Sequence, residues 1–244
     1  PFFPAFRGIE MYENELRKES NESLQNVAEK LKTQGITNVN ILSTSGRTHI
    51  EIVRIRKEIK ADLIIMGTHG VSGFREFVIG SNTFRVVSDA LCPVLSVQSK
   101  NQSSGFKNIL IPFSDRPHSR EKVKYAIRLA EIYGAALHVL GIDTADLESH
   151  DQKITLQADQ IKSIVEKHNL ECTVKIVAAA YSSKNVLNYA KEINADLIVA
   201  MGDTDPQYIT EYITGSFSQQ IINHSPIPVV SIHSAYNPDI VELY

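Results

Sequence analysis

Closely spaced glycines follow an apolar run in the first half of the chain. The segment Gly67-Thr68-His69-Gly70 comes directly after Leu63-Ile64-Ile65-Met66, and Gly80-Ser81 follows after nine residues. Glycines at the end of a buried parallel strand let backbone N–H groups approach an anion, because no Cβ atom obstructs them. Gly80-Ser81 then opens a helix, whose first amides and dipole favour negative charge. The spacing therefore predicts a phosphate-binding loop.

The same pattern occurs a second time, about 135 residues later. The recurring pairs are Lys57–Ile65 with Lys191–Val199, Gly80-Ser81 with Gly215-Ser216, and Pro93–Val97 with Pro228–Ile232. Because a strand, two glycine positions and a closing strand recur in one order, we predict two tandem copies of one unit.

Strands and helices alternate along both copies, which favours a parallel sheet with helices on both faces. We expect two doubly wound α/β domains, residues 1–98 and 106–244, joined by a polar linker at 99–105. The second repeat opens with a strand, a helix and a strand at 107–142 for which the first repeat has no counterpart. The comparison of the repeats predicts that about 40 to 45 residues of the first domain are absent from the given sequence.

The remaining elements of the first repeat follow from its apolar periodicity. We expect a long amphipathic helix from Glu10 to Gln34 and a short strand over Val39–Leu42. A second helix should run from Thr48 to about Lys60, with Ile59 among its inward residues.

The pattern G-x-x-G-x9-G-[ST] after an A-D-L-I-[IV] strand resembles the universal stress protein family in its tandem-domain form. The resemblance covers nearly the whole chain and implies a Rossmann-like fold related to the adenine nucleotide alpha hydrolases. It also implies ATP or another adenine nucleotide, with or without Mg²⁺, in the glycine loop, and an aspartate after the first strand that contacts the nucleoside. The matching residues of the first repeat are Met66, Gly67, His69, Gly70, Gly80, Ser81 and Asn82.

The second repeat departs from this pattern, because Asp205 stands where the second glycine of the loop is expected. A carboxylate aimed at a phosphate is unfavourable, and its Cβ obstructs the backbone. We therefore expect the nucleotide in the first repeat. A degenerate second site would consist of Asp115, Gly202, Gly215 and Ser216. For Asp115, a role as N-cap of the helix that starts near Arg120 is an equal alternative to nucleoside binding.

Composition and residue spacing exclude several functions. A net charge of −3 gives no attraction for nucleic acid, and no apolar run is long enough to span a bilayer. The eight histidines show no metal-ligand spacing. Cys92 and Cys172 are expected to be free thiols, as in a reducing cytoplasm.

We expect a cytoplasmic nucleotide-binding sensor of stress without catalytic residues, since no paired base, nucleophile or metal-binding carboxylate set accompanies the loop. His69 could contact phosphate, although an exposed loop histidine fits the pattern as well. One alternative is an adaptor or scaffold that binds protein partners and no nucleotide. Another, a nucleotide hydrolase or adenylyl transferase, rests on fold analogy alone. The resemblance implies that the closing strands 94–98 and 229–233 pair with each other, while association of two chains stays open.

Overall fold

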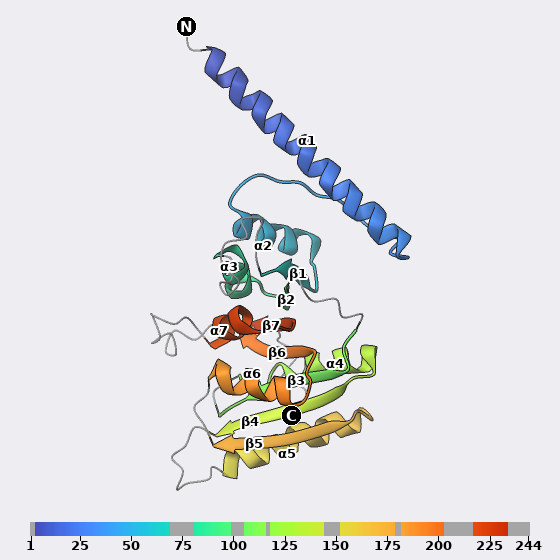
Figure 1. Cartoon of the computed structure of the whole chain (residues 1–244), viewed down its shortest axis with the longest axis vertical. Helices are drawn as coiled ribbons and strands as arrows, with labels where there is room; N and C mark the ends of the chain where they lie inside the picture. Colours follow the sequence, from blue (N-terminus) through green and yellow to red (C-terminus); the bar gives the residue numbers. More distant parts are fainter. Residues whose placement is uncertain are drawn as a thin grey trace. The chain divides into compact units, whose positions relative to one another are not determined.

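The structure, a computed structural model, describes residues 3–68, 81–98, 105–115, 118–143, 152–178, 182–202 and 217–233. Helices and strands alternate along most of the chain (Figure 1). The elements are α1 (Phe3–Thr33), α2 (Thr48–Ile59), β1 (Ile64–Gly67), α3 (Ser81–Asp89), β2 (Val94–Val97), β3 (Asn108–Phe113), α4 (Val123–Tyr133), β4 (Ala136–Asp143), α5 (Gln152–Lys167), β5 (Cys172–Ala178), α6 (Ser183–Glu192), β6 (Leu197–Gly202), α7 (Phe217–His224) and β7 (Val229–His233).

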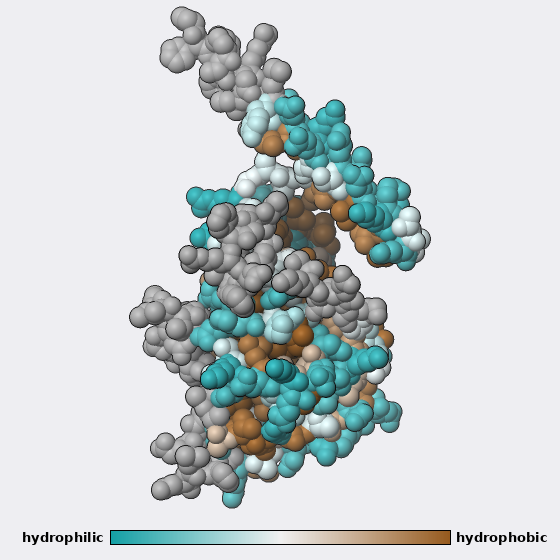
Figure 2. Space-filling model, viewed as in Figure 1, coloured by the Kyte–Doolittle hydropathy of each residue, from teal (hydrophilic) through white to brown (hydrophobic). Residues whose placement is uncertain are grey.

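Residues 1–51 form one compact unit and residues 52–244 form a second. In the first unit, the chain after α1 turns at Gly35, whose φ of 91° is accessible to glycine. The guanidinium of Arg17 in the helix donates a hydrogen bond of 3.3 Å to the hydroxyl of Ser45 in the following segment, and Ala28 of the helix is buried. One side of α1 is hydrophilic and the other carries hydrophobic residues (Figure 2), so the predicted amphipathic character of this helix is confirmed.

The described residues of the second unit form one sheet of seven strands, in the order β1-β2-β7-β6-β3-β4-β5. All neighbouring strands are parallel except β2 and β7. Strand order reverses between β3 and β6, since β4 and β5 continue to one side and β7 to the other. This arrangement confirms the predicted doubly wound α/β fold, and the carboxyl ends of β3 and β6 form its topological switch point.

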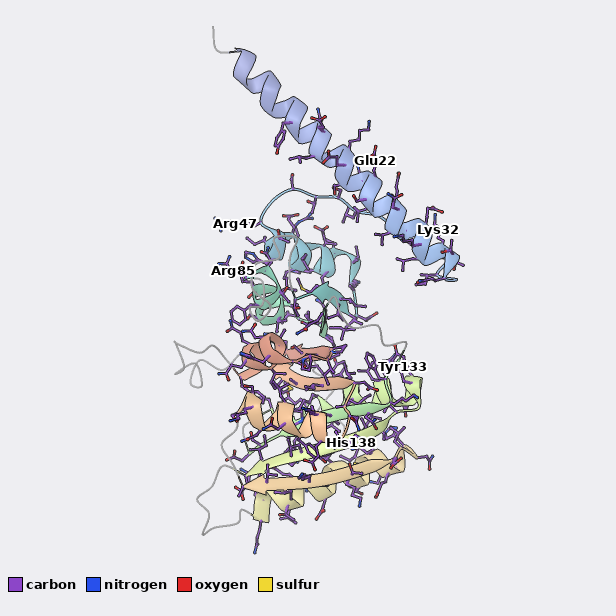
Figure 3. All side chains as sticks on the ribbon, in the orientation of Figure 1. Glu22, Lys32, Arg47, Arg85, Tyr133 and His138 are labelled. Carbon is purple, nitrogen blue, oxygen red and sulfur yellow. The ribbon has the colours of Figure 1, made fainter. Side chains whose placement is uncertain are left out.

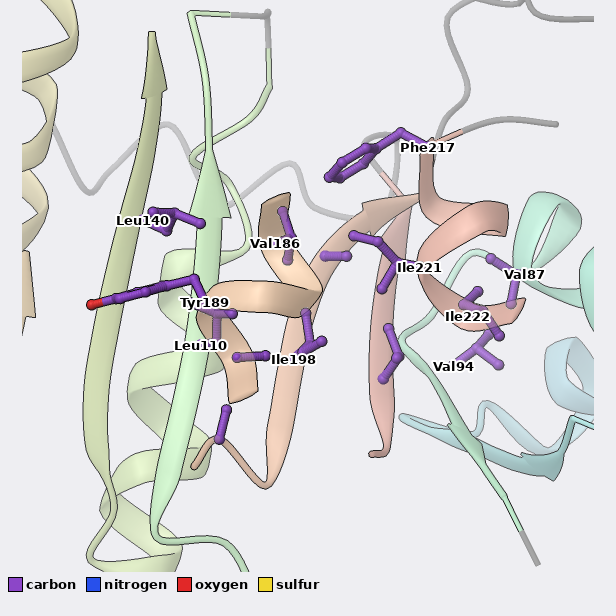
Figure 4. Close-up of a cluster of buried hydrophobic side chains, with 14 of the residues drawn as sticks. Val87, Val94, Leu110, Leu140, Val186, Tyr189, Ile198, Phe217, Ile221 and Ile222 are labelled. Atoms are coloured by element: carbon purple, nitrogen blue, oxygen red, sulfur yellow. The ribbon is translucent and has the colours of Figure 1, made fainter. Parts of the chain in front are cut away.

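Apolar side chains fill both faces of the sheet. On one face, α3, α6 and α7 pack on the strands, and Val186, Ile221 and Ile198 belong to this layer (Figure 4). On the other face, α4 and α5 cover β3, β4 and β6. Because parallel strands are covered on both faces, their sequences are apolar without alternation, as in Leu197–Gly202.

The two closing strands join the repeats. Val94 pairs with Ser231, Leu95 with Val230 and Ser96 with Val229, in antiparallel register. The Gln98 side-chain amide after β2 also donates a hydrogen bond to the carbonyl of Ser225, just after α7. The predicted pairing of these strands is confirmed.

Two local expectations for the first repeat are wrong. Residues 39–42 form no strand. A β-strand needs backbone hydrogen bonds to a neighbouring strand, and no strand among the described residues pairs with this segment. Ile59 does not point inward but is 67% exposed, at the last residue of α2. The long first helix begins earlier than expected, at Phe3, and ends at Thr33.

Candidate functional site

The carboxyl end of β1 and the first turn of α3 meet in the first repeat. The hydroxyl of Thr83 donates a hydrogen bond of 2.9 Å to the carbonyl of Gly67, and Thr83 is buried. The N–H of Thr68 continues the ladder by donating to Val97 at 3.0 Å. The bond from Thr83 fixes the start of α3 beside the end of β1, so two parts of the predicted loop lie together.

Ser81 and Asn82 occupy the exposed first turn of α3. The amides of a first helical turn lack partners within the helix, and the helix dipole makes this end attractive to anions. No acidic residue stands in this turn to oppose an anion. Arg85 lies one turn further along the helix and is exposed, so it adds positive charge to the face that Ser81 occupies.

The structure brings together only part of the predicted set. Met66 is partly buried in β1, where it packs against the core. Gly67, Ser81 and Asn82 lie at the meeting point of β1 and α3. His69, Gly70 and Gly80 fall outside the described residues.

Thr83 was not among the residues selected from the sequence. The signal existed, since Ser218 stands at the corresponding position of the second repeat and is also a buried hydroxyl residue. A hydroxyl three residues after the second glycine position in both repeats indicates a bond back to the strand end.

In the second repeat, Asp115 follows β3 and Gly202 is the last residue of β6, and these are the two strands of the switch point. β3 and β6 are adjacent and parallel, with Ile109 paired to Leu197, so their carboxyl ends lie at the same edge. Asp115 is exposed there. Its alternative role as the helix N-cap is wrong, because α4 starts at Val123 and its N-cap position is Lys122. Asp205, Gly215 and Ser216 lie outside the described residues.

Packing at Gly202 leaves room for a side chain. A Cβ atom there would lie 3.5 Å from the carbonyl oxygen of Ile232 and 3.7 Å from that of Val87, which are ordinary contacts. Gly202→Ala should therefore change the free energy of unfolding by less than about 1 kcal/mol in urea denaturation. Gly141→Ala is the matched control, since its Cβ would meet Ile154 and Phe113 at 3.1 Å and should cost about 1–3 kcal/mol. Equal losses in both variants would contradict this difference.

Neither cysteine supplies a reactive thiolate. Both are free thiols, as the sequence predicts, and Cys92 is buried. Burial raises the pKa of the Cys92 thiol. Burial and the nearby Glu166 carboxylate raise the pKa of Cys172 to about 11. Both thiols are therefore protonated at neutral pH, in which form a thiol is a weak nucleophile.

His138 projects from β4 (Figure 3) and its two ring nitrogens have partners. One nitrogen lies 2.7 Å from the hydroxyl of Thr173 and the other 3.1 Å from the amide oxygen of Asn108. Burial lowers the pKa of His138 below 6.5, and the charges of Glu171 and Asp196 offset this only in part.

The lowered pKa of His138 predicts a pH-dependent stability. Between the lowered folded pKa and the unfolded value of 6.5, the unfolded chain binds more protons than the folded one. The stabilisation is therefore present above pH 6.5 and is lost as pH falls through the folded pKa. From about pH 7.5 to about pH 5.5, the wild type should lose more stability than His138→Gln in denaturant titrations. His168→Gln, at an exposed histidine side chain, controls for the change in histidine number. Parallel pH profiles of the wild type and His138→Gln would contradict the prediction.

Two features are absent from the described residues. Within the ranges that the structure describes, no group of three or more His, Cys, Asp or Glu side chains could hold a metal ion. No helix of the same ranges is long and apolar enough to cross a membrane.

The doubly wound sheet, its switch point and the glycine-bounded strand end define a class of α/β proteins that bind ligands at the carboxyl edge of the sheet. The family model of the universal stress proteins matches the chain twice, over residues 4–98 and 105–233. The chain therefore belongs to the universal stress protein family, as its motifs predict, and carries two copies of the unit.

Known relatives agree with this assignment. A universal stress protein of Methanocaldococcus jannaschii is 34% identical over 99 residues, which cover 39% of this chain and 60% of that protein. The universal stress protein YxiE of Bacillus subtilis is 34% identical over 90 residues, 37% of this chain and 60% of its own length. The chain thus spans about 60% of the length of these relatives.

A solved structure of a universal stress protein from Archaeoglobus fulgidus is similar in fold. It superposes with a TM-score of 0.75 at 24% identity, over 91% of this chain and 79% of that one. At this identity the likeness supports the fold alone.

Proposed function

We propose that the chain binds ATP or another adenine nucleotide in its first repeat and acts as a sensor of nucleotide, without catalysis. The site consists of Met66, Gly67, His69, Gly70, Gly80, Ser81 and Asn82. The observation that carries the proposal is the hydrogen bond from Thr83 to Gly67, since it holds the exposed amides of α3 beside the strand end. The proposal assigns this site to a domain of residues 1–98, followed by a linker at 99–105 and a domain of residues 106–244.

The charges around α3 support an anionic ligand. The first turn holds no carboxylate, and Arg85 follows within one turn. A phosphate chain could accept hydrogen bonds from the Ser81 hydroxyl and from the amides of Ser81 and Asn82. The corresponding loop of the second repeat carries Asp205, which would repel a phosphate. We therefore assign the nucleotide to the first repeat, and any second site at Asp115 and Gly202 to a weaker or different ligand.

The test is the thermal stability of the full chain with increasing ATP or ADP, with and without Mg²⁺. A ligand that binds only the folded chain raises the melting temperature, because stabilisation grows as RT ln(1 + [L]/Kd). Gly80→Val should abolish this rise, since its side chain would occupy the space of the phosphate. Gly215→Val, the same change in the second repeat, is the matched control and should leave the rise intact. Loss of the rise in Gly215→Val instead would contradict the assignment to the first repeat.

The second candidate function is an adaptor that binds protein partners and no nucleotide. Asp205 in the second loop favours it for that repeat. In this case neither ATP nor ADP would shift the melting temperature of the wild type, and Gly80→Val would behave as the wild type does.

A further inference from the structure

A row of polar side chains crosses one face of the sheet near the amino ends of its strands. It runs from Asn108 at the start of β3 through His138 on β4 (Figure 3) to Thr173 on β5. His138 stands two residues before Leu140, which packs in the apolar layer under α6, so both side chains lie on that face. Tyr189 of α6 belongs to the same layer and bonds to Thr173. The row therefore connects three strands with α6.

The position of each hydrogen in this row follows from its partners. The Asn108 amide nitrogen donates to the carbonyl of Asn194 at 3.4 Å, so the Asn108 oxygen faces His138 and can only accept. The His138 Nε2 atom, 3.1 Å from that oxygen, therefore carries a hydrogen. In a neutral imidazole the other nitrogen is then an acceptor. The Thr173 hydroxyl, 2.7 Å from Nδ1, accordingly donates to it.

The row ends at the phenol of Tyr189. The Thr173 side chain bonds to this hydroxyl. Because the Thr173 hydrogen already points to His138, the Thr173 oxygen accepts the hydrogen of Tyr189. Tyr189 is 9% exposed, and its ring extends from α6 across the strands (Figure 4). With a neutral His138, every hydrogen bond of the row therefore points the same way, from Tyr189 towards Asn194.

The surroundings of His138 keep its ring neutral at pH 7. Burial lowers the pKa of His138 below 6.5, although the carboxylates of Glu171, just before β5, and Asp196, just before β6, act in the opposite direction. The ring therefore gains its proton in mild acid.

Charged groups also face Tyr189. The Nζ atom of Lys175 lies 4.7 Å from the centre of the Tyr189 ring and 2.7 Å from a carboxylate oxygen of Glu192. Burial raises the pKa of Tyr189, while Lys175 opposes this effect and Glu192 adds to it. The phenol therefore keeps its hydrogen at neutral and acidic pH and can only redirect it.

A proton on His138 is incompatible with this order of hydrogen bonds. The charged ring donates from both nitrogens, so Nδ1 must donate to the Thr173 oxygen. The Thr173 hydroxyl then directs its hydrogen to the Tyr189 oxygen, and Tyr189 loses its acceptor on the sheet. The Tyr189 hydrogen must turn to another acceptor, and the carboxylate of Glu192, three residues along α6, can receive it.

We propose that His138, Thr173 and Tyr189 form a proton-sensitive relay that links β4 and β5 to α6. The proton comes from solvent and stays on Nδ1 of His138, while Thr173 and Tyr189 keep their own hydrogens and only reverse the direction in which they donate. In mild acid the Tyr189 hydroxyl is therefore released from the sheet and donates on the side of α6. The relay needs no nucleotide in the first repeat, since all of its residues lie in the second repeat.

The test is an NMR titration of the full chain from about pH 8 to about pH 5, with carbon-13 at the Cζ atom of tyrosine and in the histidine rings. The Tyr189 signal should shift with the same midpoint as the His138 signals, because Cζ carries the oxygen whose hydrogen bonds reverse. Tyr189→Phe and His138→Gln identify the two sets of signals. Tyr133 is the internal control, since its ring packs on Phe106 at a centroid distance of 4.9 Å and its signal should not follow this midpoint.

Thr173→Val separates the relay from a direct effect of charge. The variant keeps the shape of the side chain but lacks the hydroxyl, so His138 should still titrate while the Tyr189 signal no longer follows its midpoint. Thr173→Ser retains the hydroxyl and should restore the coupled shift. Thr173 is exposed, so both variants should fold. A Tyr189 signal that follows His138 equally in Thr173→Val, or that does not follow it in the wild type, would overturn the proposal.

Discussion

Replacement of Ile198 by alanine should lower the free energy of unfolding by about 3–4 kcal/mol, in the range measured for isoleucine-to-alanine changes in tight cores. Ile198 lies in β6 between β3 and β7 and is fully buried. Its side chain belongs to the layer under α6 and α7 that Figure 4 shows. Removing three carbon atoms there loses apolar burial and leaves a cavity that the rigid sheet cannot close. Urea denaturation at neutral pH measures the difference.

Ile65→Ala is the control for this prediction. It makes the same chemical change in a strand of the same sheet, at a side chain that is 63% exposed. The loss should be below about 1 kcal/mol, since little burial disappears. Comparable losses in the two variants would contradict the exposure of the Ile65 side chain.

Asp196→Ala should destabilise the chain by about 2 kcal/mol. The carboxylate accepts two backbone N–H groups at the start of β3, and hydrogen bonds to charged groups contribute about 1.5–3 kcal/mol each where water is excluded. The hydrogen bond from the Lys107 N–H is exposed to solvent. In the variant, water can therefore bond to this N–H and compensate for part of the lost stabilisation. Thermal or urea unfolding of the variant measures the loss.

Asp62→Ala is the matched change in the first repeat. No strand of the described chain supplies amides to Asp62, so this variant should differ from the wild type by less than about 0.5 kcal/mol. We therefore expect the loss of unfolding free energy to be larger for Asp196→Ala than for Asp62→Ala, although the two aspartates stand at equivalent positions of the repeats. A loss of stability in Asp62→Ala as large as that in Asp196→Ala would contradict this expectation.

Much of the fold could be predicted from the sequence because the repeat supplies an internal comparison. Apolar runs such as Leu197–Gly202 recur with glycines and closing strands at one offset, and this predicts the parallel sheet. The pairing of the closing strands followed from the family resemblance, and the structure adds that it is antiparallel. The direction of this pairing could not come from periodicity. The apolar residues Leu95 and Val230 would face each other in a parallel or an antiparallel arrangement of the two strands.

The errors arose where tertiary partners decide local structure. Residues 39–42 have strand-forming side chains, but propensity forms no strand without a neighbour to bond. Ile59 fits the apolar spacing of α2, yet the helix ends there and the side chain meets solvent. At the candidate site, the glycines and Ser81 were predicted from motif spacing, and of these the structure describes Gly67 and Ser81. The structural role of Thr83 was missed because it depends on the position of α3 against Gly67.

The antiparallel contact between β2 and β7 has a mechanical consequence. Each repeat contributes strands to one continuous hydrogen-bonded sheet, and apolar side chains of α3 and α7 share a single layer across the contact. A hinge motion of one repeat against the other within residues 52–244 would break the backbone hydrogen bonds between β2 and β7. It would at the same time expose the apolar layer that α3 and α7 share. A displacement of α3 is therefore expected to act also on β7 of the second repeat, because α3 packs against that strand.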